Sequence, residues 1–253
     1  MAVLTCDLFS EALEMGTSLT VVLPQATRSQ IGVEQADGDG ELPVLYLLHG
    51  LSDDHTAWTR YTSIERYAAA AGLAVVMPAV GRSFYADERH GHRYWTYVSE
   101  ELPQVVSSFF RVSGRREDTF VAGLSMGGYG ALKLALTHPG RFAAAASLSG
   151  ALDIATMAQG PERAPLFEQV FGGVPGPADD LFALLDRAPV ADLPPMHVSC
   201  GYDDPLFPLN ERFVARAQEV GADVTTDFRP GTHEWGLWDT VVRDVIDWLP
   251  RRP

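Results

Sequence analysis

Two kinds of hydrophobic pattern alternate along the chain from residue 44 onward. Short, nearly continuous apolar runs predict strands covered on both faces; they occupy residues 44–48, 74–77, 120–122, 143–148, 197–200 and 224–228. Longer stretches with apolar positions every three or four residues predict helices, at residues 58–71, 101–110, 127–137, 210–220 and 237–249. This alternation favours a parallel sheet joined by crossover helices.

Two segments depart from the alternation. The Asp-Gly steps of residues 35–41 (QADGDGE) predict a hairpin turn, after a β-rich run at residues 18–23. Residues 154–195 are rich in Pro and Gly, with one short helical piece near residues 180–185. We interpret residues 154–195 as an excursion over the edge of the sheet that helps to wall a pocket, within a single domain over residues 1–253.

Composition and charge narrow the class of protein. The 253 residues are 46% hydrophobic and 21% charged, which excludes a disordered chain and supports a full core. A formal charge of -14 opposes binding to phosphate backbones, so we expect no nucleic acid partner. Two distant cysteines make no disulfide framework, and no apolar run reaches the ~18 residues that span a bilayer. We therefore expect a cytoplasmic protein without a membrane anchor.

The motif Gly123-Leu124-Ser125-Met126-Gly127 fits G-x-S-x-G and lies between a predicted strand and a predicted helix. That context is the one the motif requires, because the serine occupies a strained turn that glycines on both sides make room for. The hydroxyl then projects beside a helix N-terminus, where negative charge is favoured. Ser125 is therefore the candidate nucleophile. The alternative is a small-residue turn that only packs helix against strand.

A serine nucleophile needs a base, and His233 is the histidine best placed to supply it. It follows the last predicted strand and precedes the terminal helix, and in this fold the chain order is Ser, Asp or Glu, then His. The acid should follow the strand before, where Asp203 and Asp204 are adjacent. We favour Asp204 and interpret Asp203 as a turn residue.

The oxyanion hole needs two N–H donors. Met126 follows the nucleophile, and Leu51 follows an early strand in the sequence LYLLHG, so their amides are the candidate donors. His49 is interpreted as a hydrogen-bonded structural residue. Four aromatic residues on predicted loops are candidates to line the substrate pocket, namely Trp58, Phe84, Tyr85 and Trp95. The scattered His and Asp residues do not predict a metal site.

These motifs resemble α/β-hydrolase esterases related to esterase D, S-formylglutathione hydrolases and feruloyl and acetylxylan esterases, most of all the bacterial tributyrin esterases. The matching blocks extend over nearly the whole chain: YLLHGLSDDHTAW (46–58), GLAVVMPAVGRSFYAD (72–87), YWTYVSEELP (94–103), FVAGLSMGGYGALKLAL (120–136), CGYDD (200–204) and GTHEWGLWD (231–239). In relatives the acid is the third residue after the glycine of G-x-x-D, which corresponds to Asp204. Pro205 after it departs from the usual pattern.

The resemblance implies an α/β-hydrolase fold with a small or absent cap. It also implies hydrolysis of short-chain carboxylic esters without metal or cofactor, a small-molecule ester as partner, and a homo-oligomer as one form of assembly. Acyl transfer, or a feruloyl or S-formylglutathione substrate, would use the same triad. HGLSDD is not the oxyanion-loop form of the S-formylglutathione hydrolases, so that substrate is not the first expectation. A ligand-binding protein without turnover is the alternative from another class.

Overall fold

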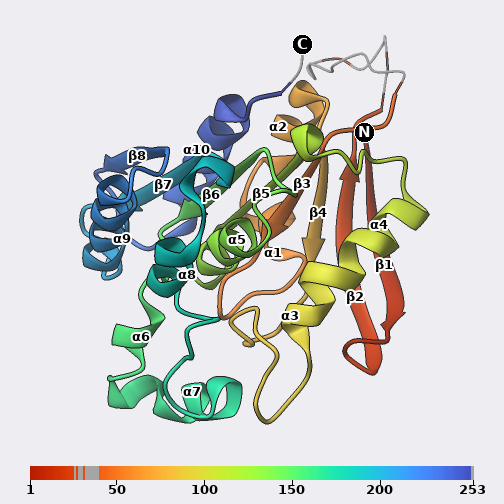
Figure 1. Cartoon of the computed structure of the whole chain (residues 1–253). Coiled ribbons are helices and arrows are strands. Elements are labelled where there is room, and N and C mark those ends of the chain that lie inside the picture. The colour runs from red at the N-terminus through yellow and green to blue at the C-terminus, as the bar shows by residue number, and fades with distance from the viewer. Residues whose placement is uncertain (26, 28–30, 32–39, 252–253) are drawn as a thin grey trace.

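The backbone of the protein is an eight-stranded, mostly parallel sheet (Figure 1). The computed structural model describes residues 1–25, 27, 31 and 40–251. The strands lie in the order β1-β2-β4-β3-β5-β6-β7-β8. Only the β1–β2 and β2–β4 pairs are antiparallel. The strands are β1 (Ala2–Ser10), β2 (Met15–Leu23), β3 (Val44–Leu48), β4 (Ala74–Pro78), β5 (Thr119–Leu124), β6 (Ala144–Leu148), β7 (Met196–Gly201) and β8 (Val224–Arg229).

Helices cover both faces of the sheet, as the continuously apolar central strands require. Helices α1 (Ala57–Tyr61), α2 (Ile64–Ala71) and α10 (Trp235–Trp248) pack on one face. The other face carries α4 (Leu102–Phe109), α5 (Met126–Thr137), α8 (Leu181–Arg187) and α9 (Phe207–Glu219). Successive residues of one strand serve the two cores in turn, with Val44 in one and Leu45 in the other.

The predicted α/β sheet is confirmed, and two helices differ from their patterns. The helix predicted over residues 58–71 is interrupted at Thr62, which is extended, and Ser63 donates its N–H to Asp239 of α10 at 2.8 Å. The helix predicted over residues 101–110 is preceded by α3 (Tyr94–Thr96) and a π-helical turn at Tyr97–Glu101. The break at Thr62 coincides with a hydrogen bond to a segment that is distant in sequence. The spacing of apolar residues in a short stretch cannot reveal such a contact.

Strand β1 was absent from the predictions, although its sequence carries a signal. Leu4, Cys6 and Leu8 are partly buried and alternate with exposed residues, as in an edge strand with one covered face. Residues 35–39 of the predicted hairpin turn lie outside the described residues. In the part of the chain that the structure describes, no helix has the length and apolar character needed to cross a bilayer.

The first part of the excursion between β6 and β7 lies beyond the ends of the central strands, and its last helix, α8, lies beside α5 (Figure 1). The excursion contains α6 (Ile154–Met157), α7 (Ala164–Phe171) and α8, with 3-10 turns at Pro161–Arg163 and Val190–Asp192. Arg89 and His90, in the loop after β4, donate backbone N–H groups to the carbonyls of Val170 and Gln169 at 2.7 and 3.0 Å. The excursion is therefore joined to the loop that follows β4.

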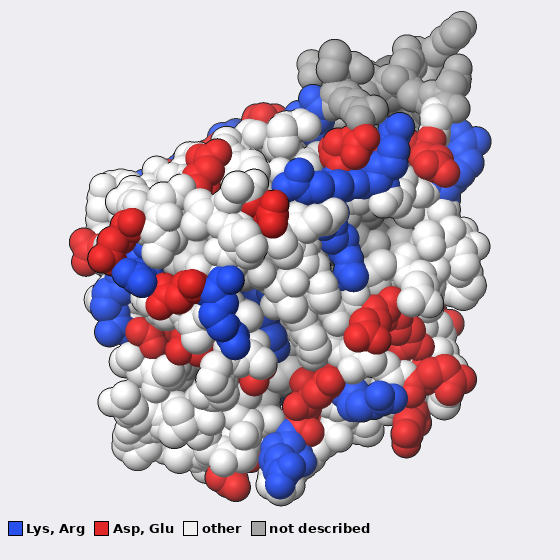
Figure 2. Space-filling model, in the orientation of Figure 1, with Lys and Arg blue, Asp and Glu red and all other residues white. Residues whose placement is uncertain are grey.

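Charge on the visible face is mixed. Figure 2 shows basic and acidic side chains interspersed there, with acidic ones gathered near the lower ends of β1 and β2. No broad basic stripe crosses this face of the described residues, in keeping with the formal charge of -14.

Candidate active site

Ser125 occupies the sharp turn between β5 and α5. Its φ is 53° and its ψ is -115°, a left-handed conformation that is costly for a residue with a Cβ atom. The turn is held by backbone hydrogen bonds from Ser125 N–H to the Leu148 carbonyl at 2.9 Å and from Ala151 N–H to the Ser125 carbonyl at 3.0 Å. The surroundings thus impose the strain, and the side chain stays partly exposed.

Two glycines of the motif are required by close backbone approach. A Cβ atom on Gly123 would lie 2.3 Å from the Gly127 carbonyl oxygen, and one on Gly127 would lie 2.4 Å from that of Leu48. Neither carbonyl group can move away without distorting the backbone. The fixed positions of G-x-S-x-G therefore have a steric reason in this chain.

The structure brings Ser125, His233 and Asp204 into one hydrogen-bonded chain. His233 Nε2 lies 3.1 Å from Ser125 Oγ, and its Nδ1 lies 2.8 Å from Asp204 Oδ2. The loop between β8 and α10 carries His233, whose ring packs edge-on against Trp238 at 4.8 Å. Three residues from separate strand ends thus converge at the carboxyl edge of the sheet, where ligands of open α/β sheets bind.

Asp204 and Asp203 have opposite surroundings. Burial of Asp204 raises the pKa of its carboxyl, but hydrogen bonds from His233, the Leu206 N–H and Ser149 outweigh this and leave the pKa below its ordinary value. Asp203 is exposed, and its N–H donates to the Gly231 carbonyl at 3.0 Å. Of the two candidates, Asp204 faces the imidazole, and Asp203 belongs to the turn.

The backbone of residues 48–51 passes close to Ser125. A Cβ atom on Gly50 would lie 3.7 Å from Ser125 Cβ, and Leu51 and Met126 both line the cavity beside the serine. His49 is buried and holds this segment: it accepts from Val80 N–H at Nε2, so Nδ1 donates to the Gly50 carbonyl at 2.7 Å. Burial lowers the pKa of His49 to about 4, which keeps this tautomer neutral.

Of the four aromatic candidates for the substrate pocket, one lines a cavity at Ser125. Phe84 lines the smaller cavity beside Ser125. Trp58 and Tyr85 are fully buried and line neither cavity at Ser125. The indole of Trp58 donates to the Leu48 carbonyl at 3.2 Å, and the hydroxyl of Tyr85 donates to the His49 carbonyl at 2.9 Å. Both side chains therefore support the segment before Leu51 from the protein interior.

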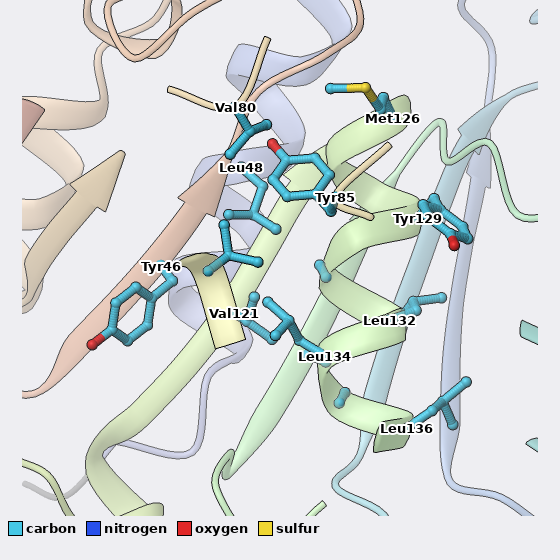
Figure 3. Packing of buried hydrophobic residues seen from close by; sticks show 14 of the residues in the cluster. Tyr46, Leu48, Val80, Tyr85, Val121, Met126, Tyr129, Leu132, Leu134 and Leu136 are labelled. Atoms are coloured by element: carbon cyan, nitrogen blue, oxygen red, sulfur yellow. The ribbon is translucent and has the colours of Figure 1, made fainter. Parts of the chain in front are cut away.

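Tyr85 lies beside Leu48 and against α5 (Figure 3). A Cβ atom on Gly130 of α5 would lie 2.5 Å from the Tyr85 ring, so the glycine makes room for it. Trp95 also lies outside both cavities: its ring stacks on His138 at 5.7 Å, and Lys133 Nζ lies 4.2 Å from the ring centroid. The prediction that all four aromatics lie on loops is wrong for two of them, because Trp58 is in α1 and Trp95 is in α3.

Two cavities meet at Ser125 and His233. The smaller one, about 180 Å³, is mainly apolar; besides these two residues it is lined by Leu51, Phe84, Met126, Ala151, Met157, Arg163, Pro205 and Leu206. The larger one, about 480 Å³, is more polar, with Gly50, Leu51, Ser52, Asp53, Leu124, Arg163, Glu234, Trp235 and Trp238. Sequence patterns missed Met157 and Arg163, because the excursion that carries them has no motif.

An eight-stranded sheet of this order, with a Ser–His–Asp chain at its carboxyl edge, defines a serine hydrolase of the α/β-hydrolase fold. The family model described as "Putative esterase" matches residues 10–193. The chain therefore belongs to the Esterase family and is a carboxylic ester hydrolase of the serine type.

Relatives along the full length agree with this class. An acetyl esterase of Caldicellulosiruptor saccharolyticus is 28% identical over 99% of both chains. Among solved structures, the fluorophosphonate-binding serine hydrolase FphF of Staphylococcus aureus has a TM-score of 0.89 and 35% identity, over 99% of both chains. The S-formylglutathione hydrolase FrmB of the same organism has a TM-score of 0.85 and 34% identity, over 99% of both chains. The resemblance found in the sequence is confirmed.

Proposed function

We propose that this esterase hydrolyses short-chain carboxylic esters through an acyl-enzyme on Ser125. The observation that carries the proposal is the chain from Ser125 Oγ to His233 at 3.1 Å and from His233 to Asp204 at 2.8 Å, beside an apolar cavity of about 180 Å³. That volume is below the 300–1,000 Å³ of typical drug-sized sites, so it suits a short acyl group.

In the first half of the reaction, Ser125 Oγ attacks the ester carbonyl and His233 Nε2 takes the hydroxyl proton. The N–H groups of Met126 and Leu51 stabilise the oxyanion. The tetrahedral intermediate then expels the alcohol, to which His233 returns the proton. In the second half, water attacks the acyl-enzyme by the same steps and releases the acid. Asp204 accepts from His233 Nδ1–H throughout, which fixes the tautomer and stabilises the imidazolium.

Substitution of the serine tests this proposal. We expect Ser125→Ala to lose on the order of 10⁴-fold or more in kcat on p-nitrophenyl butyrate, since the attacking oxygen is absent. Ser108→Ala, at an exposed position on α4, is the matched control and should keep wild-type activity. Circular dichroism confirms folding. Near-wild-type turnover by Ser125→Ala would remove Ser125 from the mechanism.

The length of the acyl group tests the cavity assignment. With p-nitrophenyl esters from acetate to decanoate, kcat/KM should fall once the chain exceeds the apolar cavity. A second candidate substrate class is the thioesters, favoured by the likeness to FrmB. Thioesters would use the same serine, so S-acyl compounds belong in the same panel.

Location and assembly are proposed on separate grounds. Cys6 and Cys200 are both free thiols, which is typical of a reducing compartment and supports a cytoplasmic protein. Self-association is proposed from the family resemblance alone. Sedimentation of the purified protein would measure it.

A further inference from the structure

One charged side chain contacts both cavities at the nucleophile. Arg163 ends the 3-10 turn Pro161–Arg163 of the excursion and lines the smaller and the larger cavity. The two cavities share it with Leu51, Ser125 and His233, so the guanidinium-bearing side chain borders the space where the reacting carbonyl would lie. No step of the proposed hydrolysis uses it.

In the part of the chain that the structure describes, the Arg163 side chain forms no hydrogen bond or ion pair, and the residue is partly buried. Asp153, at the start of the excursion, pairs with Arg212 at 2.6 Å and accepts from Thr156 N–H at 2.8 Å. An arginine side chain without a carboxylate partner beside the nucleophile can bind an anionic group of a ligand through charge-assisted hydrogen bonds.

The two carboxylates that line the larger cavity are also held by the backbone. Glu234 accepts from the N–H groups of Gly236 and Leu237 at 2.8 and 2.9 Å, which caps α10. Burial raises the pKa of the Asp53 carboxyl, and the backbone of Gly50 opposes that shift. Among the residues that the structure describes, neither carboxylate forms an ion pair with Arg163, although both line the larger cavity with it.

We propose that Arg163 binds a carboxylate on the leaving-group portion of the substrate, so that the preferred substrates are short-chain esters of hydroxy acids. The inference rests on the proposed function. A short acyl group fits the smaller cavity, whose lining apart from Ser125, Arg163 and His233 is apolar. The larger, more polar cavity holds the leaving group, with Arg163 at the boundary.

A matched pair of esters tests the proposal. The acetate ester of 3-hydroxybenzoate carries a carboxylate on its leaving group, and the acetate ester of methyl 3-hydroxybenzoate is its neutral counterpart. The quantity to measure is the ratio of kcat/KM for the anionic ester over the neutral one. We expect Arg163→Gln to lower this ratio about tenfold, because a charge-assisted hydrogen bond is lost. Arg163→Lys should keep part of the preference, since it retains the charge without the planar fork.

Arg82→Gln is the control, because Arg82 is exposed and lines neither cavity. It removes the same charge and should leave the ratio as in the wild type. An unchanged ratio in Arg163→Gln overturns the proposal, and so does an equal fall in Arg82→Gln. Mono-(4-nitrophenyl) succinate carries its carboxylate on the acyl group. If Arg163→Gln lowers kcat/KM for this ester alone, the assignment of the carboxylate to the leaving group is wrong.

Hydrolysis of the neutral ester separates the two proposals. If Ser125→Ala abolishes it while Arg163→Gln leaves the ratio unchanged, the esterase mechanism stands and the role of Arg163 falls. If Arg163→Gln fails to fold, the same ratio in Arg163→Lys, measured at low and at 0.5 M salt, keeps the test decisive. A preference that rests on the arginine charge weakens as salt screens it.

Discussion

Asp203 and Asp204 show how neighbouring residues of one type acquire different roles. The side chain of Asp204 has no exposed surface and accepts from His233, whereas Asp203 is on the outside of the same turn. The peptide geometry alone separates them, because adjacent side chains of a tight turn point in different directions. A carboxylate that orients a histidine must face its Nδ1–H.

Amide substitutions distinguish the two residues in solution. Asp204→Asn should lower kcat on p-nitrophenyl butyrate by ~10⁴-fold, because an amide stabilises the wrong histidine tautomer and no imidazolium. Asp203→Asn should stay near wild type. Steady-state kinetics of both variants measure the difference, and a larger loss in Asp203→Asn would reverse the assignment of the acid.

At the scale of elements, Lys133 joins α5 to its surroundings. Its ammonium is buried, pairs with Asp179 of the excursion at 2.7 Å and donates to the Tyr85 carbonyl at 3.1 Å. Burial lowers the pKa of Lys133, and Asp179 opposes that shift. Tyr129 of α5 also donates to the Asp179 carbonyl at 2.7 Å. The helix that begins at the nucleophile is thereby joined to the excursion that carries Arg163.

Breaking this ion pair should cost stability. We expect Lys133→Met to lower the free energy of unfolding by about 3 kcal/mol, because a partly buried Asp179 carboxylate loses its partner. Arg216→Met breaks an exposed pair with Asp186 and should cost less than about 1 kcal/mol. Urea unfolding measures both. If both substitutions lower the free energy of unfolding equally, the Lys133–Asp179 pair does not stabilise the fold more than an exposed pair does.

At the scale of the whole molecule, two hydrophobic cores hold the sheet. Two buried histidines, His49 and His197, have pKa values lowered by burial and make the fold sensitive to acid. The folded-state pKa of His49 is about 4, below the ordinary value of 6.5. Between these values the unfolded chain binds a proton that the folded chain excludes. Stability therefore falls as the pH drops from 6.5 to 4, by up to about 3 kcal/mol from this residue.

Urea unfolding at pH 7.5 and at pH 4.5 measures this loss of stability. The difference in free energy of unfolding between the two pH values should shrink in His49→Asn, and should persist in His90→Asn, where an exposed histidine is removed. If His49→Asn does not fold, an NMR titration of the wild-type imidazole replaces it. A His49 ring that protonates near pH 6.5 would contradict the expectation.

The periodic and motif-bearing parts of this protein were determined by local sequence. Strand β3 was predicted at its observed bounds because a continuous apolar run has few alternatives between two helix layers. Ser125, Asp204 and His233 could be chosen because each follows a strand, and the carboxyl ends of parallel strands share one edge. The esterase family followed from the same motifs.

Only the tertiary structure decided which residues surround the nucleophile. Trp58 and Tyr85 support residues 48–49 because the carbonyls of Leu48 and His49 accept hydrogen bonds from their side chains. Arg163 lines both cavities because this part of the excursion passes over the strand ends. The sequence of the excursion has no periodic apolar pattern from which that course could be predicted. Side chains that serve a site through space, from segments without periodicity, are specified by packing, and packing is a property of the folded chain as a whole.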